Sequence, residues 1–315
     1  MYYLGIDLGG TNIAAGLLND EKTLICKASL PTPATDPVAV VDSMAALCRR
    51  LVEKEGISFD EVAYVGVACP GMVDREEGIV VYTPNVAFDN FPLARALCDR
   101  IPIKQVYLEN DANAAALGEA VAGCARGKKN VVMITLGTGV GGGIIIDGHI
   151  YRGHNGEAGE LGHMVIERNG IPCPCGRRGC LEAYASATAL IRMTKEKMAK
   201  RPDSMMHEIA KKYGRVSGKT AFDAERADDE AGAEVVSAYI SYLACGITNI
   251  INIFQPETVV IGGGICHERD NLLNRLFPLV RKEAYGSGRI QTAELRIAEL
   301  SGDAGIVGAA CLGLA

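Results

Sequence analysis

Residues 131–146 read VVMITLGTGVGGGIII, which is a strand-like run, a glycine loop and a second strand-like run in direct succession. The same order occurs at the start of the chain, where residues 2–8, the turn Gly9-Gly10-Thr11 and residues 12–18 follow one another. Self-similarity within a chain is typical of repeated structural units. We therefore expect an α/β fold with two related domains that face each other across a cleft, each offering a hairpin loop to one ligand.

The loop at 137–142, GTGVGG, satisfies the G-x-G-x-x-G pattern of dinucleotide-binding sites. That pattern requires a helix directly after the loop, so that the pyrophosphate meets the helix N-terminus. Ile144, Ile145 and Ile146 favour a strand instead, so we reject a dinucleotide site. A glycine hairpin can still bind phosphate through its N–H groups, although a plain glycine-rich turn remains the alternative.

A second phosphate-loop pattern, GRVSGKT at 214–220, is one residue short of a Walker A motif. The residues before it favour a helix rather than the strand that this motif needs. We expect 214–219 to be a solvated loop.

The segment from His163 to Cys180 contains a candidate metal site. His163, Cys173, Cys175 and Cys180 offer one nitrogen and three sulfurs, a ligand set that suits tetrahedral zinc. Cys173 and Cys175 are too close in sequence for an unstrained disulfide. The alternative is a cysteine-rich loop with free thiols.

The sequence ENDAN at 109–113 lies where a short strand is expected to end and a helix to begin. Functional side chains are common at this position in open α/β sheets. Asp111 is the candidate for a catalytic carboxylate, and a helix N-cap is its structural alternative.

The chain has 315 residues, 48% of them hydrophobic and 22% charged, with a net charge of −6. The acidic balance argues against a nucleic-acid partner, because no basic field attracts phosphates. We expect no signal peptide, no apolar stretch of membrane-spanning length and no membrane partner. The scattered cysteines among the 11 favour a reducing cytoplasm.

Periodicity and turn residues predict the remaining elements. Strands are expected at 23–30, 62–69, 105–108, 131–136, 143–146, 258–261 and 294–298, and helices at 36–55, 111–125, 181–200, 204–213, 228–254, 270–285 and 303–314.

Taken together, these segments resemble the ROK family of sugar kinases, within the actin-like ATPase superfamily. The resemblance spans nearly the whole chain. Some members carry an N-terminal DNA-binding segment and act as repressors, whereas this chain starts directly at its first strand and so resembles the kinase branch, in particular the bacterial glucokinases. The motifs that carry the resemblance are DLGGT at 7–11, ENDAN at 109–113, LGTGVGG at 136–142, ELGH at 160–163, CPCGRRGCLE at 173–182 and VIGGG at 260–264.

The resemblance implies a role for each matching residue. Asp111 would be the base that takes the proton from the sugar 6-hydroxyl, and His163 would serve both zinc and sugar. Sugar hydroxyls would be bound by Asn110, Asp111, Glu160, His163 and Glu182, with Gly71 and Asn85 as looser matches. ATP would be bound by Asp7, Gly9, Gly10, Thr11, Asn12, Thr138, Gly139, Gly263 and Gly264.

The implied fold has two actin-like, ribonuclease H-like domains: 1–112, to which a helix at 301–315 returns, and a larger domain at 113–300 with the zinc loop. The implied activity is the ATP-dependent phosphorylation of a hexose, most simply glucose, at its 6-hydroxyl, with Mg²⁺ and structural Zn²⁺ as cofactors. Other hexoses, such as N-acetylmannosamine, allose or fructose, and a non-catalytic sugar sensor are the alternatives. A cytoplasmic homodimer or homotetramer is expected.

Overall fold

The computed structural model describes residues 1–314 and divides the chain into two compact units. The first contains Met1–Met133, Gly143–Gly159 and the chain from Ala298 onward, and the second contains Ile134–Gly142 and Glu160–Ile297. Both units mix strands and helices, which confirms the predicted α/β class.

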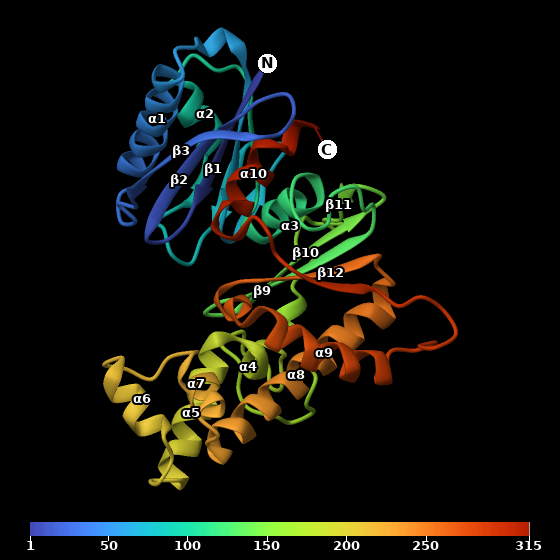
Figure 1. Ribbon diagram of the computed structural model, residues 1–315. Helices are drawn as coiled ribbons and strands as arrows, with labels where there is room; N and C mark the ends of the chain where they lie inside the picture. The colour runs from blue at the N-terminus through green and yellow to red at the C-terminus, as the bar shows by residue number, and fades with distance from the viewer. Residues whose placement is uncertain (315) are drawn as a thin grey trace. The chain divides into compact units, whose positions relative to one another are not determined.

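A five-stranded sheet forms the centre of the first unit, in the order β3-β2-β1-β4-β8. β1 pairs antiparallel with β2 and parallel with β4, and β4 pairs parallel with β8. Helices α1 and α10 cover opposite faces of this sheet (Figure 1). The bounds are β1 Tyr2–Leu8, β2 Asn12–Leu18, β3 Leu24–Pro31, β4 Val62–Cys69, β8 Val106–Asn110, α1 Pro37–Lys54, α3 Asp111–Val121 and α10 Ala304–Ala310.

The two faces of β1 carry different side chains because successive residues of a strand point to opposite sides. Leu4 and Ile6 are fully buried in the hydrophobic core that α1 shares. The opposite face packs so closely on α10 that a β-carbon at Gly5 would overlap the Ile306 carbonyl oxygen. Asp7 lies on this second face, where the carboxylate approaches Gly305.

A small antiparallel sheet, β5-β6-β7, follows β4 and was not predicted from the sequence. Its strands are short, and the short helix after them, α2, was missed as well. The bounds are β5 Met72–Asp74, β6 Ile79–Tyr82, β7 Asp89–Phe91 and α2 Leu93–Cys98. Strands of three or four residues give too few alternations for a period-two signal to stand out.

A second five-stranded sheet has the order β11-β10-β9-β12-β13. Its strand β10 follows the glycine loop directly, so the strand predicted after the loop is confirmed, and the helix that a dinucleotide-binding turn needs does not begin at this place. The bounds are β9 Val131–Leu136, β10 Val140–Ile146, β11 His149–Ile150, β12 Thr258–Gly262 and β13 Glu294–Ile297.

Helices make up most of the second unit, and α8 packs against α4, α5, α7 and α9. The predicted helix 181–200 is broken at Ser186, whose side chain caps α5 by accepting a hydrogen bond from Ala189 N. The short α7 was not predicted. The bounds are α4 Glu182–Ala185, α5 Ala187–Lys200, α6 Met206–Lys212, α7 Thr220–Arg226, α8 Glu230–Phe254 and α9 Arg269–Glu283.

By length and composition alone, the 25-residue helix α8 could cross a membrane. The expectation that no apolar stretch reaches that length is therefore wrong. Its apolar window is 56% buried against the other helices of the unit, and the central helix of a packed domain has the same composition. Its length is weak evidence for a membrane span.

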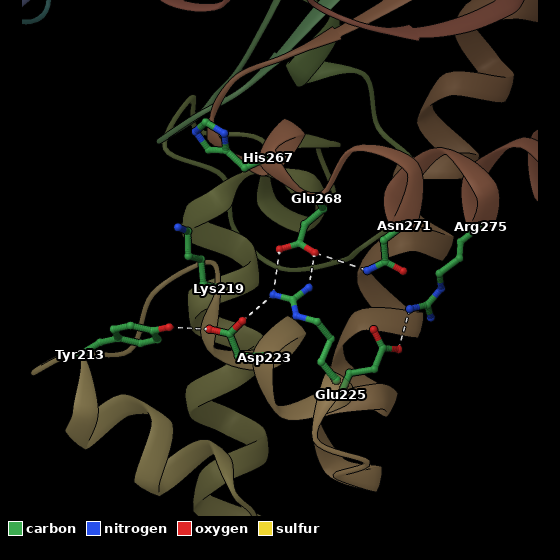
Figure 2. Close-up of a pocket in the computed structure, with 9 residues that line it drawn as sticks. Tyr213, Lys219, Asp223, Glu225, His267, Glu268, Asn271 and Arg275 are labelled. Atoms are coloured by element: carbon green, nitrogen blue, oxygen red, sulfur yellow. Dashed lines mark hydrogen bonds and ion pairs between the residues drawn. The ribbon is translucent and has the colours of Figure 1, made fainter.

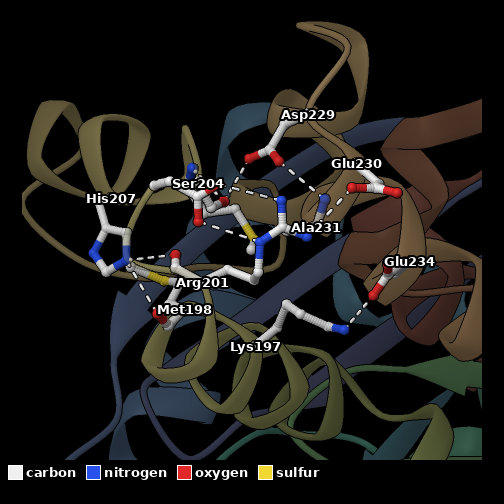
Figure 3. Close-up of polar contacts among 11 residues, drawn as sticks. Lys197, Met198, Arg201, Ser204, His207, Asp229, Glu230, Ala231 and Glu234 are labelled. Carbon is white, nitrogen blue, oxygen red and sulfur yellow. Dashed lines mark hydrogen bonds and ion pairs between the residues drawn. The ribbon is translucent and has the colours of Figure 1, made fainter.

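Polar contacts join the end of α5 to the start of α8 (Figure 3). Ser204 donates a hydrogen bond to Asp229, the N-cap of α8, and Arg201 pairs with Glu230. Lys197 pairs with Glu234 one turn further along α8. Exposed ion pairs contribute little each, so the hydrogen bond from the buried Ser204 to Asp229 is the main polar link here.

Candidate functional site

The tight turn between β1 and β2 is closed by a hydrogen bond from Gly9 N to Asn12 O, 2.9 Å long. Thr32 Oγ1 donates to Gly9 O at 2.7 Å and holds the turn from the side of β3. A β-carbon at Gly10 would lie 2.8 Å from Asn85 Cβ. Residues 9–12, predicted to bind phosphate, thus lie beside Asn85, one of the predicted sugar contacts.

Asp7 is the last polar residue of β1 before this turn. Burial, and secondarily the negative charge of Asp111, raise the pKa of Asp7 from 3.8 to about 6. The same two carboxylates contribute to a raised pKa at Cys69, after burial, so the three side chains lie in one neighbourhood. Carboxylate oxygens are the ligands that Mg²⁺ prefers, and a cation would relieve the repulsion between Asp7 and Asp111.

Asn110, and not Asp111, is the N-cap of α3. Its Oδ1 accepts hydrogen bonds from Ala112 N at 2.9 Å and Asn113 N at 3.3 Å. Its Nδ2 donates to Gly71 O at 3.3 Å, which links two of the predicted sugar contacts. Asp111 is the exposed first residue of the helix, so the N-cap alternative for Asp111 is wrong.

Gly71 occupies a backbone conformation that only glycine adopts readily, with φ +88°. A β-carbon there would also overlap the Tyr82 carbonyl oxygen. The position of the Gly71 carbonyl beside Asn110 therefore depends on the absence of a side chain.

The second unit contains the candidate metal centre. The ligand atoms of His163, Cys173, Cys175 and Cys180 all lie within 4.8 Å of one another. Cys175 Sγ and Cys180 Sγ are 3.7 Å apart, and Cys173 Sγ and His163 Nδ1 are 3.7 Å apart. Zinc–sulfur bonds of about 2.3 Å at the tetrahedral angle give a sulfur–sulfur separation of about 3.7–3.8 Å. The four residues therefore fit zinc.

The thiols of this centre have different acidities without a metal. Burial raises the pKa of Cys173 to about 12. A hydrogen bond from the backbone of Arg177 lowers the pKa of Cys175. Zinc binds thiolates, so a bound cation would have to remove the proton from Cys173, and we expect the affinity for metal to rise with pH.

The two ring nitrogens of His163 face different groups. Nδ1 faces the cysteines, and Nε2 lies 3.7 Å from Glu160 Oε2. Both side chains were predicted to bind sugar, and the structure brings them together. The imidazole can bind metal on one side and a hydroxyl on the other, as the resemblance implies.

Glu182 joins the metal centre to the glycine loop of the second unit. Its Oε2 accepts a hydrogen bond from Val140 N at 3.0 Å, and its Oε1 lies 3.7 Å from Cys173 Sγ. A β-carbon at Gly139 would overlap Glu182 Oε2. Thr188 Oγ1 donates to Thr138 O at 2.8 Å, which attaches the loop to α5. The predicted phosphate and sugar contacts of this unit are therefore adjacent.

The glycines after β12 lie beside the same loop. Gly263 has φ +92°, and a β-carbon there would overlap the carbonyl of Leu136, the last residue of β9. Gly264 begins a 3₁₀ turn, Gly264–Glu268, and has open space around it. The loop at 137–139 and the predicted adenosine contacts are thus neighbours.

A cavity of about 560 Å³ begins at this turn and was not predicted from the sequence. Figure 2 shows Lys219 and His267 on one side and a network of charges on the other. Arg226 bridges Asp223 and Glu268, with a distance of 2.6 Å to Glu268 Oε2, and so ties α7 to the end of the turn. Part of the polar wall comes from His267 and Glu268, at the end of the turn that Gly264 begins.

Glu109 is the other feature that sequence reasoning missed. It is only 1% exposed and pairs with Arg152 and Arg75. A signal was present: an acidic residue follows the apolar residues of a short predicted strand, directly before Asn110 and Asp111. A charge in that position must be paired in the fold.

Comparison with known proteins shows the family to which the chain belongs. Residues 3–315 match the model of the ROK family. A glucokinase of Thermotoga maritima is 39% identical over 98% of this chain and 96% of its own length. A xylose repressor of Bacillus spizizenii is 31% identical over 90% of this chain and 70% of its own. The crystal structure of a ROK family glucokinase from Streptomyces griseus, in complex with glucose and AMPPNP, is 33% identical, with a TM-score of 0.82 and 99% of both chains covered. The chain belongs to the ROK family.

Proposed function

We propose that this protein is an ATP-dependent hexose kinase that phosphorylates glucose at its 6-hydroxyl. The observation that carries the proposal is the exposed position of Asp111 directly after strand β8, next to Asn110, whose side chain caps α3. The Asp111 carboxylate is exposed at the end of a sheet strand, a place where functional side chains are common in open α/β sheets, and its Oδ1 accepts a hydrogen bond from Ala112 N at 2.8 Å. The glucokinases among the relatives support the same assignment.

In the proposed reaction, Asp111 accepts the proton of the 6-hydroxyl as that oxygen attacks the γ-phosphorus of ATP, and ADP departs with the bond electrons. A positioned base of this kind contributes about 10²–10⁴-fold to the rate. Asn110, Glu160 and His163 would orient the sugar through hydrogen bonds. Correct alignment of the two substrates supplies much of the remaining acceleration.

The nucleotide would be bound by the glycine turns. Residues 9–12 and 137–139 offer backbone N–H groups to phosphate oxygens. Mg²⁺, when bound with ATP near Asp7, supplies positive charge that neutralises the phosphates. We assign the adenosine to the cavity lined by Lys219 and His267, because it begins at the turn that Gly264 opens.

Zinc, when bound, would be structural, because four protein ligands leave no open position for a reacting water. The residues around it would then hold the sugar contacts in place. Cys173 lies next to Glu182 and His163, both proposed to bind sugar.

Several finer expectations belong to the same proposal. The domain division at 112, the closure of two domains over a cleft, a cytoplasmic location, a homodimer or homotetramer and the absence of nucleic-acid and membrane partners stay predictions. The xylose repressor among the relatives keeps a non-catalytic sugar sensor as the second candidate.

The test is ADP release from Mg-ATP by folded, zinc-loaded protein against glucose, mannose, fructose, allose, N-acetylglucosamine and N-acetylmannosamine, with a reaction lacking sugar as background. Glucose turned over above the others is the expected result. A preference for another hexose would overturn the substrate and keep the mechanism. No turnover with any sugar would favour the sensor.

A further inference from the structure

Glu109 is a buried carboxylate that contacts three segments of the first unit. Oε1 accepts hydrogen bonds from Asn110 N and from Asn113 Nδ2, both at 3.2 Å. Oε2 lies 2.7 Å from Arg152 Nε and 3.2 Å from Arg75 Nε. One side chain thus joins the β8–α3 junction to residues far away in the sequence.

Each of these segments carries or adjoins a residue that is proposed to bind the sugar. Asn110 and Asp111 follow Glu109 directly. Arg75 follows β5, the strand that begins after Gly71, and the Gly71 carbonyl accepts from Asn110. The Glu109 side chain therefore links the β8–α3 junction to the segment that begins at Gly71. Asn110 contacts the same segment.

Arg152 brings in the third segment. Its carbonyl accepts a hydrogen bond from Ala158 N at 3.0 Å, which closes a loop at 152–158. Its Nη1 donates to Ile150 O at 3.1 Å, so the guanidinium is held at both ends. Only Gly159 separates the end of this loop, Ala158, from Glu160 in the chain.

Stability alone does not explain the Glu109 centre, by which we mean Glu109 with Arg75 and Arg152. A buried ion pair is often no more stabilising than apolar side chains of the same volume, because both charges lose their hydration. Desolvation lowers the pKa of Arg75, which reflects that cost. What the centre does provide is a fixed geometry, through four contacts on one carboxylate.

We propose that Glu109 is a positioning residue of the phosphorylation reaction, which holds Asn110 and Asp111 in register with the Gly71 segment and the 152–158 loop. The proposal rests on the proposed kinase function. It concerns sugar binding in particular, because the nucleotide is assigned to other residues, the glycine turns and the cavity at His267.

The test compares the variants Glu109→Gln and Arg152→Met with the wild type, measuring kcat and the KM of each substrate in protein shown to be folded by circular dichroism. We expect the KM for sugar to rise about tenfold or more, since small displacements of bound groups have large effects. The KM for ATP should stay within about twofold of the wild type. Arg152→Lys, which keeps the charge, should recover part of the loss.

A purely structural role would give a different result. It would lower the fraction of folded enzyme, and hence the apparent kcat, while leaving both KM values unchanged. Arg100→Met is the matched control, because it removes another arginine–carboxylate pair of the same unit, with Asp42, and should leave both KM values as in the wild type.

Folded Glu109→Gln protein with an unchanged sugar KM would overturn the proposal. Should that variant fail to fold, Arg152→Met and Arg75→Met decide in the same way, since the Arg75 side chain is 39% exposed and its loss is milder. Wild-type protein that phosphorylates no sugar would overturn the kinase function and this inference together, whereas an active wild type with unaffected variants overturns the inference alone.

Discussion

The substitution Asp7→Asn should stabilise the protein at neutral pH while weakening its activity. Burial and the charge of Asp111 raise the pKa of Asp7 from 3.8 to about 6, so the ionised carboxylate is disfavoured in the folded state. This rise in the pKa, at about 1.4 kcal/mol per pKa unit, corresponds to a free-energy difference of roughly 3 kcal/mol between the two protonation states. Asparagine has nearly the same shape and carries no charge.

The sign of the pH dependence follows from the raised pKa. Below about pH 4, Asp7 is protonated in folded and unfolded protein alike, and the substitution should change little. As the pH rises through about 6, the folded wild type must lose a proton it holds more tightly than the unfolded chain does, and its stability falls. The advantage of the variant should therefore grow from near zero to at most about 3 kcal/mol by pH 7.5.

The assay is urea unfolding at pH 4.5, 6 and 7.5 without nucleotide, followed by far-ultraviolet circular dichroism because the chain has no tryptophan. Asp20→Asn is the control: hydrogen bonds from the N-terminal amine and Tyr3 lower the pKa of Asp20, so its substitution should not stabilise. An Asp7→Asn variant that is no more stable than the wild type at pH 7.5, or whose advantage is independent of pH, would refute this reasoning.

Three further substitutions test other parts of the site. Asp111→Asn should lower kcat by about 10²–10⁴-fold with sugar binding by calorimetry retained, and a variant that stays active would exclude Asp111 as the base. Cys175→Ser should lower the zinc content, measured by atomic emission, from about one per chain and reduce the melting temperature, whereas Cys245→Ser, outside the cluster, should do neither. Gly71→Ala should reduce both stability and sugar affinity, because its β-carbon meets a carbonyl; Gly56→Ala, at φ +65° in open space, should cost only about 1 kcal/mol and leave sugar binding unchanged.

The long strands and helices of the two main sheets could be predicted because their apolar residues recur with a clear period. The strands β1, β2, β4 and β9 begin and end at the predicted residues. The small sheet after Gly71 could not be predicted, because its strands are too short to show alternation. The break at Ser186 was missed for another reason: apolar residues continue on both sides of it, and only the cap reveals the end of α4.

The candidate site, too, could be predicted only in part. Glycine loops and the cysteine cluster are visible because each consists of residues close in sequence. The Glu109 centre joins residues 75, 109 and 152. At the cavity beside His267, ion pairs of Arg226 with Glu268 and of Arg275 with Glu225 join α7 to the start and the body of α9. Such pairs depend on tertiary packing, which no local pattern encodes.

The close packing of α10 on the first sheet has a consequence for how the protein is made. Gly5 in β1 and Gly66 in β4 each lie where a β-carbon would overlap a backbone carbonyl oxygen of α10. The first strand of the chain is thus covered by a helix that is synthesised about 300 residues later. At about 5–20 residues per second, β1 waits about 15–60 s for this helix. During that time the face of the sheet that α10 covers is without this helix, and a chaperone that binds this face would act on a nascent chain rather than on a finished one.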